Sequence, residues 1–167
     1  MKSGKNIVLI GMPGSGKSTV GVILAKQISF SFLDTDVLIQ VSEKRSLQDI
    51  MDAEGHLALR EIEARILLTV ELENHVIATG GSAAYSDAAM RHLGANAIIV
   101  FLDTSLDTLT ARIHNFTTRG IAKRLDQSFE DLFQERLALY NQYADLTISC
   151  EGLTQEEISG RIIEAVS

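Results

Sequence analysis

The sequence contains few of the residues that mark specialised classes of protein. One cysteine, Cys150, and one proline among 167 residues exclude an intramolecular disulfide framework, a cysteine-based zinc cluster, collagen and proline-rich linkers. Tryptophan is absent and aromatic residues make up 5%, so stacking platforms for single-stranded nucleic acid are not expected. Lysine and arginine number 15 against 22 acidic residues, a net charge of -7, which argues against nonspecific binding to duplex nucleic acid.

Long hydrophobic runs are also missing from the sequence. The apolar run at residues 7–10 stops at Gly11, far short of a secretory leader or of the ~18 apolar residues of a membrane span. We therefore expect a cytoplasmic, monomeric enzyme with a small-molecule substrate and neither a membrane nor a nucleic-acid partner. The length and the 46% hydrophobic share are those of an ordinary globular domain, so residues 1–167 are predicted to form a single domain.

Short runs rich in β-branched residues alternate with longer amphipathic stretches along the chain. Strands are predicted at residues 6–10, 30–33, 76–78, 97–102 and 146–150. Helices are predicted at residues 17–29, 46–73 with a break near Gly55, 87–93, 105–114, 128–143 and 154–166. The alternation predicts an α/β fold in which a parallel sheet is covered by helices on both faces. The polar segment 115–127 is the exception, and it is predicted to be a mobile loop.

The strongest chemical signal lies between the first predicted strand and the first predicted helix. Residues 11–18 read Gly-Met-Pro-Gly-Ser-Gly-Lys-Ser, which fits the pattern G-x4-G-K-[ST]. Its glycines let successive amides turn inward around phosphate oxygens. Lys17 supplies a positive charge to the terminal phosphates, and the hydroxyl of Ser18 suits magnesium. The motif predicts a phosphate-binding loop at the N-terminus of a helix.

Two acidic residues follow the second predicted strand. Because the carboxyl ends of parallel strands meet at one edge of a sheet, Asp34 and Asp36 are expected beside the phosphate loop. Asp34 could then hold magnesium through water, and Asp36 could orient a hydroxyl group or accept its proton. The alternative is that one of them only caps a helix.

Three separated arginines and one glycine turn are further candidates. Arg60, Arg119 and Arg136 each carry a planar fork that can bind a carboxylate or a phosphate. Each taken alone is more often part of a solvated helix face. The turn at residues 79–82, Thr-Gly-Gly-Ser, is either a flexible connection or a place where the backbone approaches a small ligand closely.

Taken together, these residues resemble the shikimate kinase family, small P-loop kinases related to the nucleoside monophosphate kinases. The resemblance runs from residue 6 to about residue 166. Its landmarks are residues 11–19, Asp34-Thr35-Asp36, Glu54-Gly55 followed by Arg60 and Glu63, residues 78–81, Arg112 seven residues before Arg119, and Glu135-Arg136 before Leu139-Tyr140. The family fold is a three-layer P-loop kinase with a five-stranded parallel sheet in the order 2-3-1-4-5 and a mobile lid, here about residues 115–127.

The resemblance also implies a role for each matching residue. The phosphates of ATP would be bound by Gly14, Ser15, Gly16, Lys17, Ser18 and Thr19, with Mg2+ at Ser18 and Asp34. Arg112 would pack against adenine, and Arg119 would reach the transferred phosphate from the lid. The substrate would be held by Asp36 at its hydroxyl groups, by Arg60 and Arg136 at its carboxylate, and by the backbone of Gly80 and Gly81. The catalytic residues would be Lys17, Asp36 and Arg119, and the reaction would convert shikimate to shikimate 3-phosphate.

The sequence departs from the family pattern in three places on the acceptor side. Ser82 replaces a third glycine, Gly120-Ile121-Ala122 replaces Pro-Leu-Leu after the lid arginine, and Ala138 replaces a proline. These changes leave two alternatives open, namely a kinase for another acceptor such as gluconate and a regulatory module that binds ATP without transfer. A nucleoside monophosphate kinase would need an inserted segment to build a base pocket, and the sequence has none.

Overall fold

The computed structural model describes residues 5–113 and 120–167. The apolar run after Lys5 forms strand β1 (Asn6–Ile10), in which every residue is buried. Strand β1 lies in the middle of a parallel sheet whose order is β2-β3-β1-β4-β5. The other strands are β2 (Ser31–Asp34), β3 (His75–Ala78), β4 (Ala97–Asp103) and β5 (Leu146–Ser149). The predicted α/β class and the strand order implied by the family are both confirmed.

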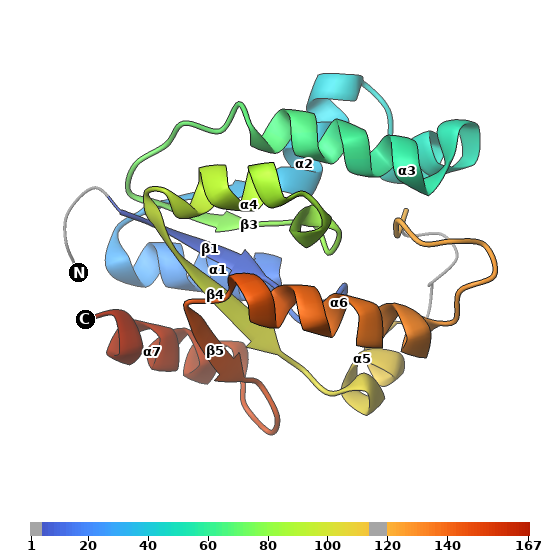
Figure 1. Ribbon diagram of the computed structural model, residues 1–167. Helices are drawn as coiled ribbons and strands as arrows, with labels where there is room; N and C mark the ends of the chain where they lie inside the picture. Colours follow the sequence, from blue (N-terminus) through green and yellow to red (C-terminus); the bar gives the residue numbers. More distant parts are fainter. Residues whose placement is uncertain (1–4, 114–119) are drawn as a thin grey trace.

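Helices cover both faces of this sheet (Figure 1). They are α1 (Lys17–Ile28), α2 (Thr35–Glu43), α3 (Leu47–Leu67), α4 (Asp87–Gly94), α5 (Leu106–Arg112), α6 (Phe129–Tyr143) and α7 (Gln155–Val166), with a short 3-10 helix η1 at Ala83–Tyr85. Within the described residues no helix is long and apolar enough to cross a membrane.

Successive side chains of β1 point to opposite faces of the sheet and belong to two separate hydrophobic cores. Ile7 and Leu9 pack with α1 and α7 on one face of the sheet, whereas Val8 and Ile10 pack with α4, α5 and α6 on the other. Side chains of a strand point to opposite faces in turn, so a strand buried on both faces shows the continuous apolar run seen in the sequence. The outer helices thereby fix the position of the loop that follows β1.

Helices α2 and α3 form a smaller apolar cluster beside the sheet, with Ile39 and Ile50 at its centre. Helix α2 was not predicted from the sequence. Its apolar residues lie on several sides, because Ile39 is buried while Val37 and Val41 are more than half exposed, and this hides the helical period. The predicted break near Gly55 is confirmed, since that residue has φ 84° and ψ 177° inside α3. The predicted end at residue 73 is six residues too long.

The second half of the predicted loop, residues 120–127, is packed against the rest of the molecule. Ala122 is buried in the α2–α3 cluster, and Ile121 contacts the core on the α6 side of the sheet. Gly120 has φ 63° and donates its amide to Oε1 of Gln48 at 2.8 Å. A proline can adopt neither this φ nor this hydrogen bond, which explains why glycine fits at position 120. Residues 114–119 lie outside the described part of the chain, so mobility of the whole segment stays a prediction.

Candidate active site

The loop between β1 and α1 has the backbone of a phosphate-binding loop. Gly11, Gly14 and Gly16 have φ angles of 147°, 84° and 93°, a region that side chains disfavour and glycine tolerates. A Cβ atom on Gly14 would lie 3.0 Å from the side chain of Ile113, so space is limited there as well. The strand, glycine turn and helix predicted from the motif are all present.

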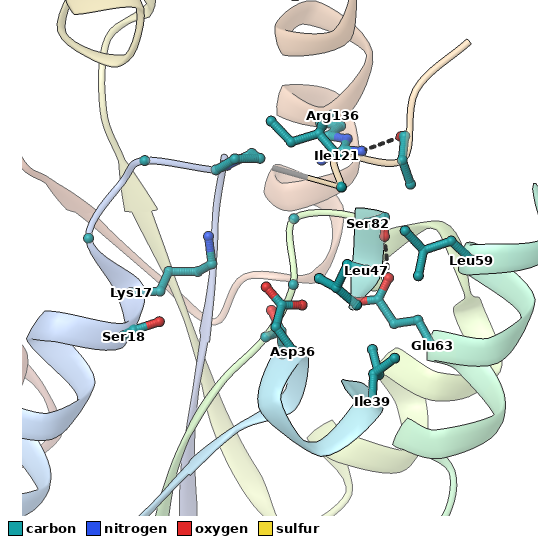
Figure 2. Close-up of a pocket in the computed structure, with 18 of the residues that line it drawn as sticks. Lys17, Ser18, Asp36, Ile39, Leu47, Leu59, Glu63, Ser82, Ile121 and Arg136 are labelled. Atoms are coloured by element: carbon teal, nitrogen blue, oxygen red, sulfur yellow. Dashed lines mark hydrogen bonds between the residues drawn. The ribbon is translucent and has the colours of Figure 1, made fainter. Parts of the chain in front are cut away.

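Lys17 reaches back from the first turn of α1 across this loop (Figure 2). Its Nζ donates to the carbonyl oxygens of Gly11 at 2.8 Å and Met12 at 2.9 Å. Burial lowers the pKa of Lys17 to about 8, although the charge of Asp36 opposes this shift. The amine therefore remains largely protonated at neutral pH. The carbonyls take two of its three donors.

Ser18 and Asp34 meet at the mouth of the loop. The hydroxyl of Ser18 donates to Oδ2 of Asp34 at 2.6 Å, and Oδ1 of Asp34 accepts the amide hydrogens of Asp36 and Val37 at the start of α2. Asp34 therefore caps α2 and also lies beside Ser18, and its role in holding magnesium stays a prediction. No cluster of three metal-binding side chains occurs among the described residues. One hydroxyl and one carboxylate suit Mg2+, which keeps several waters and uses substrate phosphates as ligands.

Asp36 and Glu63 form a pair of acidic side chains around Gly80. A Cβ atom on Gly80 would lie 2.5 Å from Oε1 of Glu63 and 2.6 Å from Oδ1 of Asp36, so both carboxylates lie close to this glycine, and Figure 2 shows the two acids near each other. Burial, with a further contribution from the charge of Asp36, raises the pKa of Glu63 to about 7. The hydroxyl of Ser82 donates to Oε2 of Glu63, while Oε1 is buried without a hydrogen-bond partner.

The pairing of Glu63 with Ser82 was not predicted from the sequence. Glu63 was noted only as a landmark of the family pattern, and Ser82 only as a departure from it. The sole signal lies in the turn itself, because glycines at residues 80 and 81 leave room for side chains from other elements to approach. The hydroxyl at position 82 fills part of that room and holds one oxygen of the acid.

Arg136, on α6, is the most deeply buried cation of the site. Its side chain is 1% exposed, and its Nη1 would lie 2.6 Å from a Cβ atom on Gly81. Its Nη2 donates to the carbonyl oxygen of Ala122 at 2.7 Å, and Nη2 of Arg60 lies 3.5 Å from the same oxygen. The structure thus brings the two arginines together. Arg136 lines the cavity, whereas Arg60 is not part of its wall.

Three further residues were predicted to belong to the site. Arg112 lies at the loop, where its Nη1 donates to the carbonyl oxygen of Gly14 at 3.3 Å. Arg119 lies outside the described residues. The amide of Gly80 is already donated to the hydroxyl of Thr35 at 3.1 Å, so Gly80 offers close approach rather than a free donor.

A cavity of about 380 Å³ joins these groups. The phosphate loop and Arg112 line it together with Asp36, Glu63 and Arg136. Apolar side chains close the acceptor end: Ile39, Leu47, Leu59 and Ile121. An anion held at the loop therefore faces a second compartment that contains both negative and positive side chains.

A phosphate loop directly after β1, an acid at the end of β2 and a parallel sheet of this order define a P-loop phosphotransferase. Residues 13–167 match the model of the shikimate kinase family, and the chain belongs to that family. It is similar to the shikimate kinases of Rippkaea orientalis, at 40% identity over 98% of this chain and 88% of that protein, and of Persephonella marina, at 34% over 95% and 97%. Among solved structures, shikimate kinase from Acinetobacter baumannii in complex with shikimate superposes with a TM-score of 0.88 at 28% identity, covering 97% of this chain and 92% of that one.

Proposed function

We propose that this protein transfers the terminal phosphoryl group of ATP to a hydroxyl of shikimate, giving shikimate 3-phosphate. The observation that carries the proposal is the meeting of the phosphate loop and a buried arginine in one cavity. Lys17, Asp36 and Arg136 all line this cavity. A buried guanidinium is costly unless an anion or an acceptor pairs with it, and a carboxylate matches its fork. The similarity to shikimate kinases supports shikimate as the acid.

On the nucleotide side, the amides of the phosphate loop and Lys17 would hold and neutralise the phosphates. Arg112 would lie against the nucleotide, because it already folds over Gly14 at the mouth of the loop. Ser18 and Asp34 would hold Mg2+, which offsets phosphate charge when bound. Arg119 would complete the charge stabilisation from the lid, by the family resemblance.

On the acceptor side, Asp36 would orient the attacking hydroxyl and accept its proton. Glu63 lies next to it, and its raised pKa limits the repulsion that two full charges would create. Arg136 and Arg60 would grip the carboxylate, with Gly80 and Gly81 allowing the ring to approach the backbone. One domain would thus supply both compartments. Hydroxyl and phosphate would be held in line, which is the main contribution that phosphoryl transfer requires of a protein.

The test is an ATP-consumption screen with purified protein, Mg2+ and one acceptor at a time: shikimate, quinate, gluconate or a nucleoside monophosphate. We expect turnover with shikimate and none above background with a nucleoside monophosphate. The Lys17→Ala protein serves as the matched control for contaminating kinases. A protein that prefers gluconate would keep the mechanism and change the acceptor. A protein that binds ATP but turns over none of these acids would contradict the proposal.

A further inference from the structure

An aromatic ring lies against both arginines that were predicted to bind the carboxylate, Arg60 and Arg136. Tyr85, at the end of η1, has its ring centre 3.4 Å from Cζ of Arg60 and 5.5 Å from Cζ of Arg136. The first distance is that of direct stacking of a guanidinium on a ring face, and the second still lies within the ~6 Å range of a cation–π contact. Helix η1 contacts α3 and α6, the helices that carry the two arginines, and Tyr85 therefore bridges them.

The hydroxyl of Tyr85 is hydrogen-bonded to a side chain of α6. It donates to Oε1 of Glu135 on α6, and Oε2 of Glu135 accepts from Nε2 of Gln127 at 3.1 Å. Burial raises the pKa of the Tyr85 phenol, so the phenol stays protonated and keeps its role as a donor. The bond from Tyr85 lowers the pKa of Glu135, which stays a carboxylate. This carboxylate lies 4.0 Å from Nη2 of Arg60 and 3.5 Å from Nη1 of Arg124.

Two guanidinium groups in one site repel each other, and their orientation has to be enforced. Burial lowers the pKa of Arg60 most, and the charge of Arg136 lowers it further. The Nε atoms of both arginines are buried without a hydrogen-bond partner. Hydrogen bonds at Nε therefore do not fix the planes of these groups. The face of Tyr85 is the surface against which the plane of Arg60 rests.

We propose that Tyr85 is a positioning residue for the acceptor carboxylate, because its ring fixes the guanidinium of Arg60 beside that of Arg136. The Nη2 atoms of both arginines converge on one oxygen, the carbonyl of Ala122, at 3.5 and 2.7 Å. This convergence shows that the two forks can donate to a single acceptor group. The inference rests on the proposed function, since it concerns the carboxylate of the substrate.

The experiment replaces Tyr85 and measures steady-state kinetics separately for shikimate and for ATP. Tyr85→Leu removes the ring face, and we expect the KM for shikimate to rise about 2- to 30-fold, the range that one cation–π contact is worth. The KM for ATP and kcat should stay within twofold of wild type. Tyr85→Phe keeps the ring and loses the hydroxyl, with its hydrogen bonds to Glu135 and Arg136, so it should restore the KM for shikimate to within about threefold.

Tyr143→Leu is the matched control, because Tyr143 is also partly buried and also donates to a carboxylate, that of Asp87 at 3.0 Å, outside the cavity. It should leave every constant unchanged. Thermal unfolding is measured on each variant, and Tyr85→Met replaces Tyr85→Leu if the latter does not fold. The same change in an Arg60→Ala background should produce no further loss of kcat/KM for shikimate.

An unchanged KM for shikimate in Tyr85→Leu, or an equal rise in the KM for ATP, would overturn the positioning role. So would a Tyr85→Phe protein as impaired as Tyr85→Leu, because the hydroxyl and not the ring would then be responsible. These results leave the proposed function standing. A wild-type protein that does not phosphorylate shikimate would overturn the proposed function and this inference together.

Discussion

Replacing Gly80 by alanine tests how closely the two acids approach the backbone. The added Cβ atom would lie 2.5 Å from Oε1 of Glu63 and 2.6 Å from Oδ1 of Asp36, where ordinary contact begins at 3.4 Å. Each oxygen must therefore retreat by about 1 Å. Both belong to the ends of side chains, so they can move without breaking the fold. The expected damage is to the site rather than to stability.

The size of the effect follows from that displacement. A misplacement of about 1 Å in a reacting arrangement can cost ~10²-fold in rate. We therefore expect kcat/KM for shikimate to fall about 100-fold in Gly80→Ala. The KM for ATP should change little, because the nearest neighbours of the new methyl group are Glu63 and Asp36 and not the loop at residues 11–18.

A coupled assay of ADP release measures this change, with Gly160→Ala as the matched control. Gly160 lies in α7 with no atom within 4 Å of its Cβ position. Its replacement should leave kinetics unchanged and raise stability by ~0.5–1 kcal/mol, as for glycine to alanine within a helix. A Gly80→Ala protein with kcat/KM within threefold of wild type would refute the arrangement of Asp36 and Glu63 around Gly80.

Three further predictions follow from the same site. Lys17→Ala should lower kcat by ~10³–10⁵, as for other cations that act on a transferred phosphoryl group, and near-normal turnover would exclude a catalytic loop. Arg60→Lys and Arg136→Lys should each raise the KM for shikimate about 10- to 100-fold, since one charged hydrogen bond contributes ~1.5–3 kcal/mol. If the acceptor were neutral, neither substitution would change its KM. The pKa of Glu63, raised to about 7, lies above its unfolded value of 4.5, so its contribution to stability is full below pH 4.5 and is lost as pH rises through 7. Glu63→Gln should abolish that loss in thermal unfolding between pH 5 and pH 8, and a parallel loss in both proteins would contradict the shift.

The parts of the fold that the sequence predicted are those governed by local physics. Strand β1 is buried on both faces, so its residues form one unbroken apolar run that is visible without any partner. The predicted helix at residues 154–166 begins with a capping box between Thr154 and Glu157, with bonds of 3.2 and 2.8 Å. Such signals need no knowledge of the rest of the chain.

The parts that escaped prediction depend on which elements come together. Glu63 lies on a long helix and carries no sign in the sequence that it will be buried, and only the packing of α3 against the turn at residues 79–82 places it beside Ser82. Arg60 does not line the cavity as the structure stands, and its guanidinium lies near the carbonyl oxygen of Ala122, which does. Tyr85 gave no signal either, because its partners are 25 and 51 residues away along the chain.

The carboxylate of Asp34 has a consequence for how the two ligands influence each other. One of its oxygens is tied to Ser18 at the phosphate loop, and the other to the amide of Asp36, the residue proposed to face the acceptor. Under the proposed function, a nucleotide whose metal is held by Ser18 and Asp34 would change the hydrogen bonds that Asp34 makes to the first turn of α2. Linkage makes such an effect reciprocal, so a bound acceptor must alter nucleotide affinity by the same factor. A single side chain, that of Asp34, would then couple the binding of the two substrates.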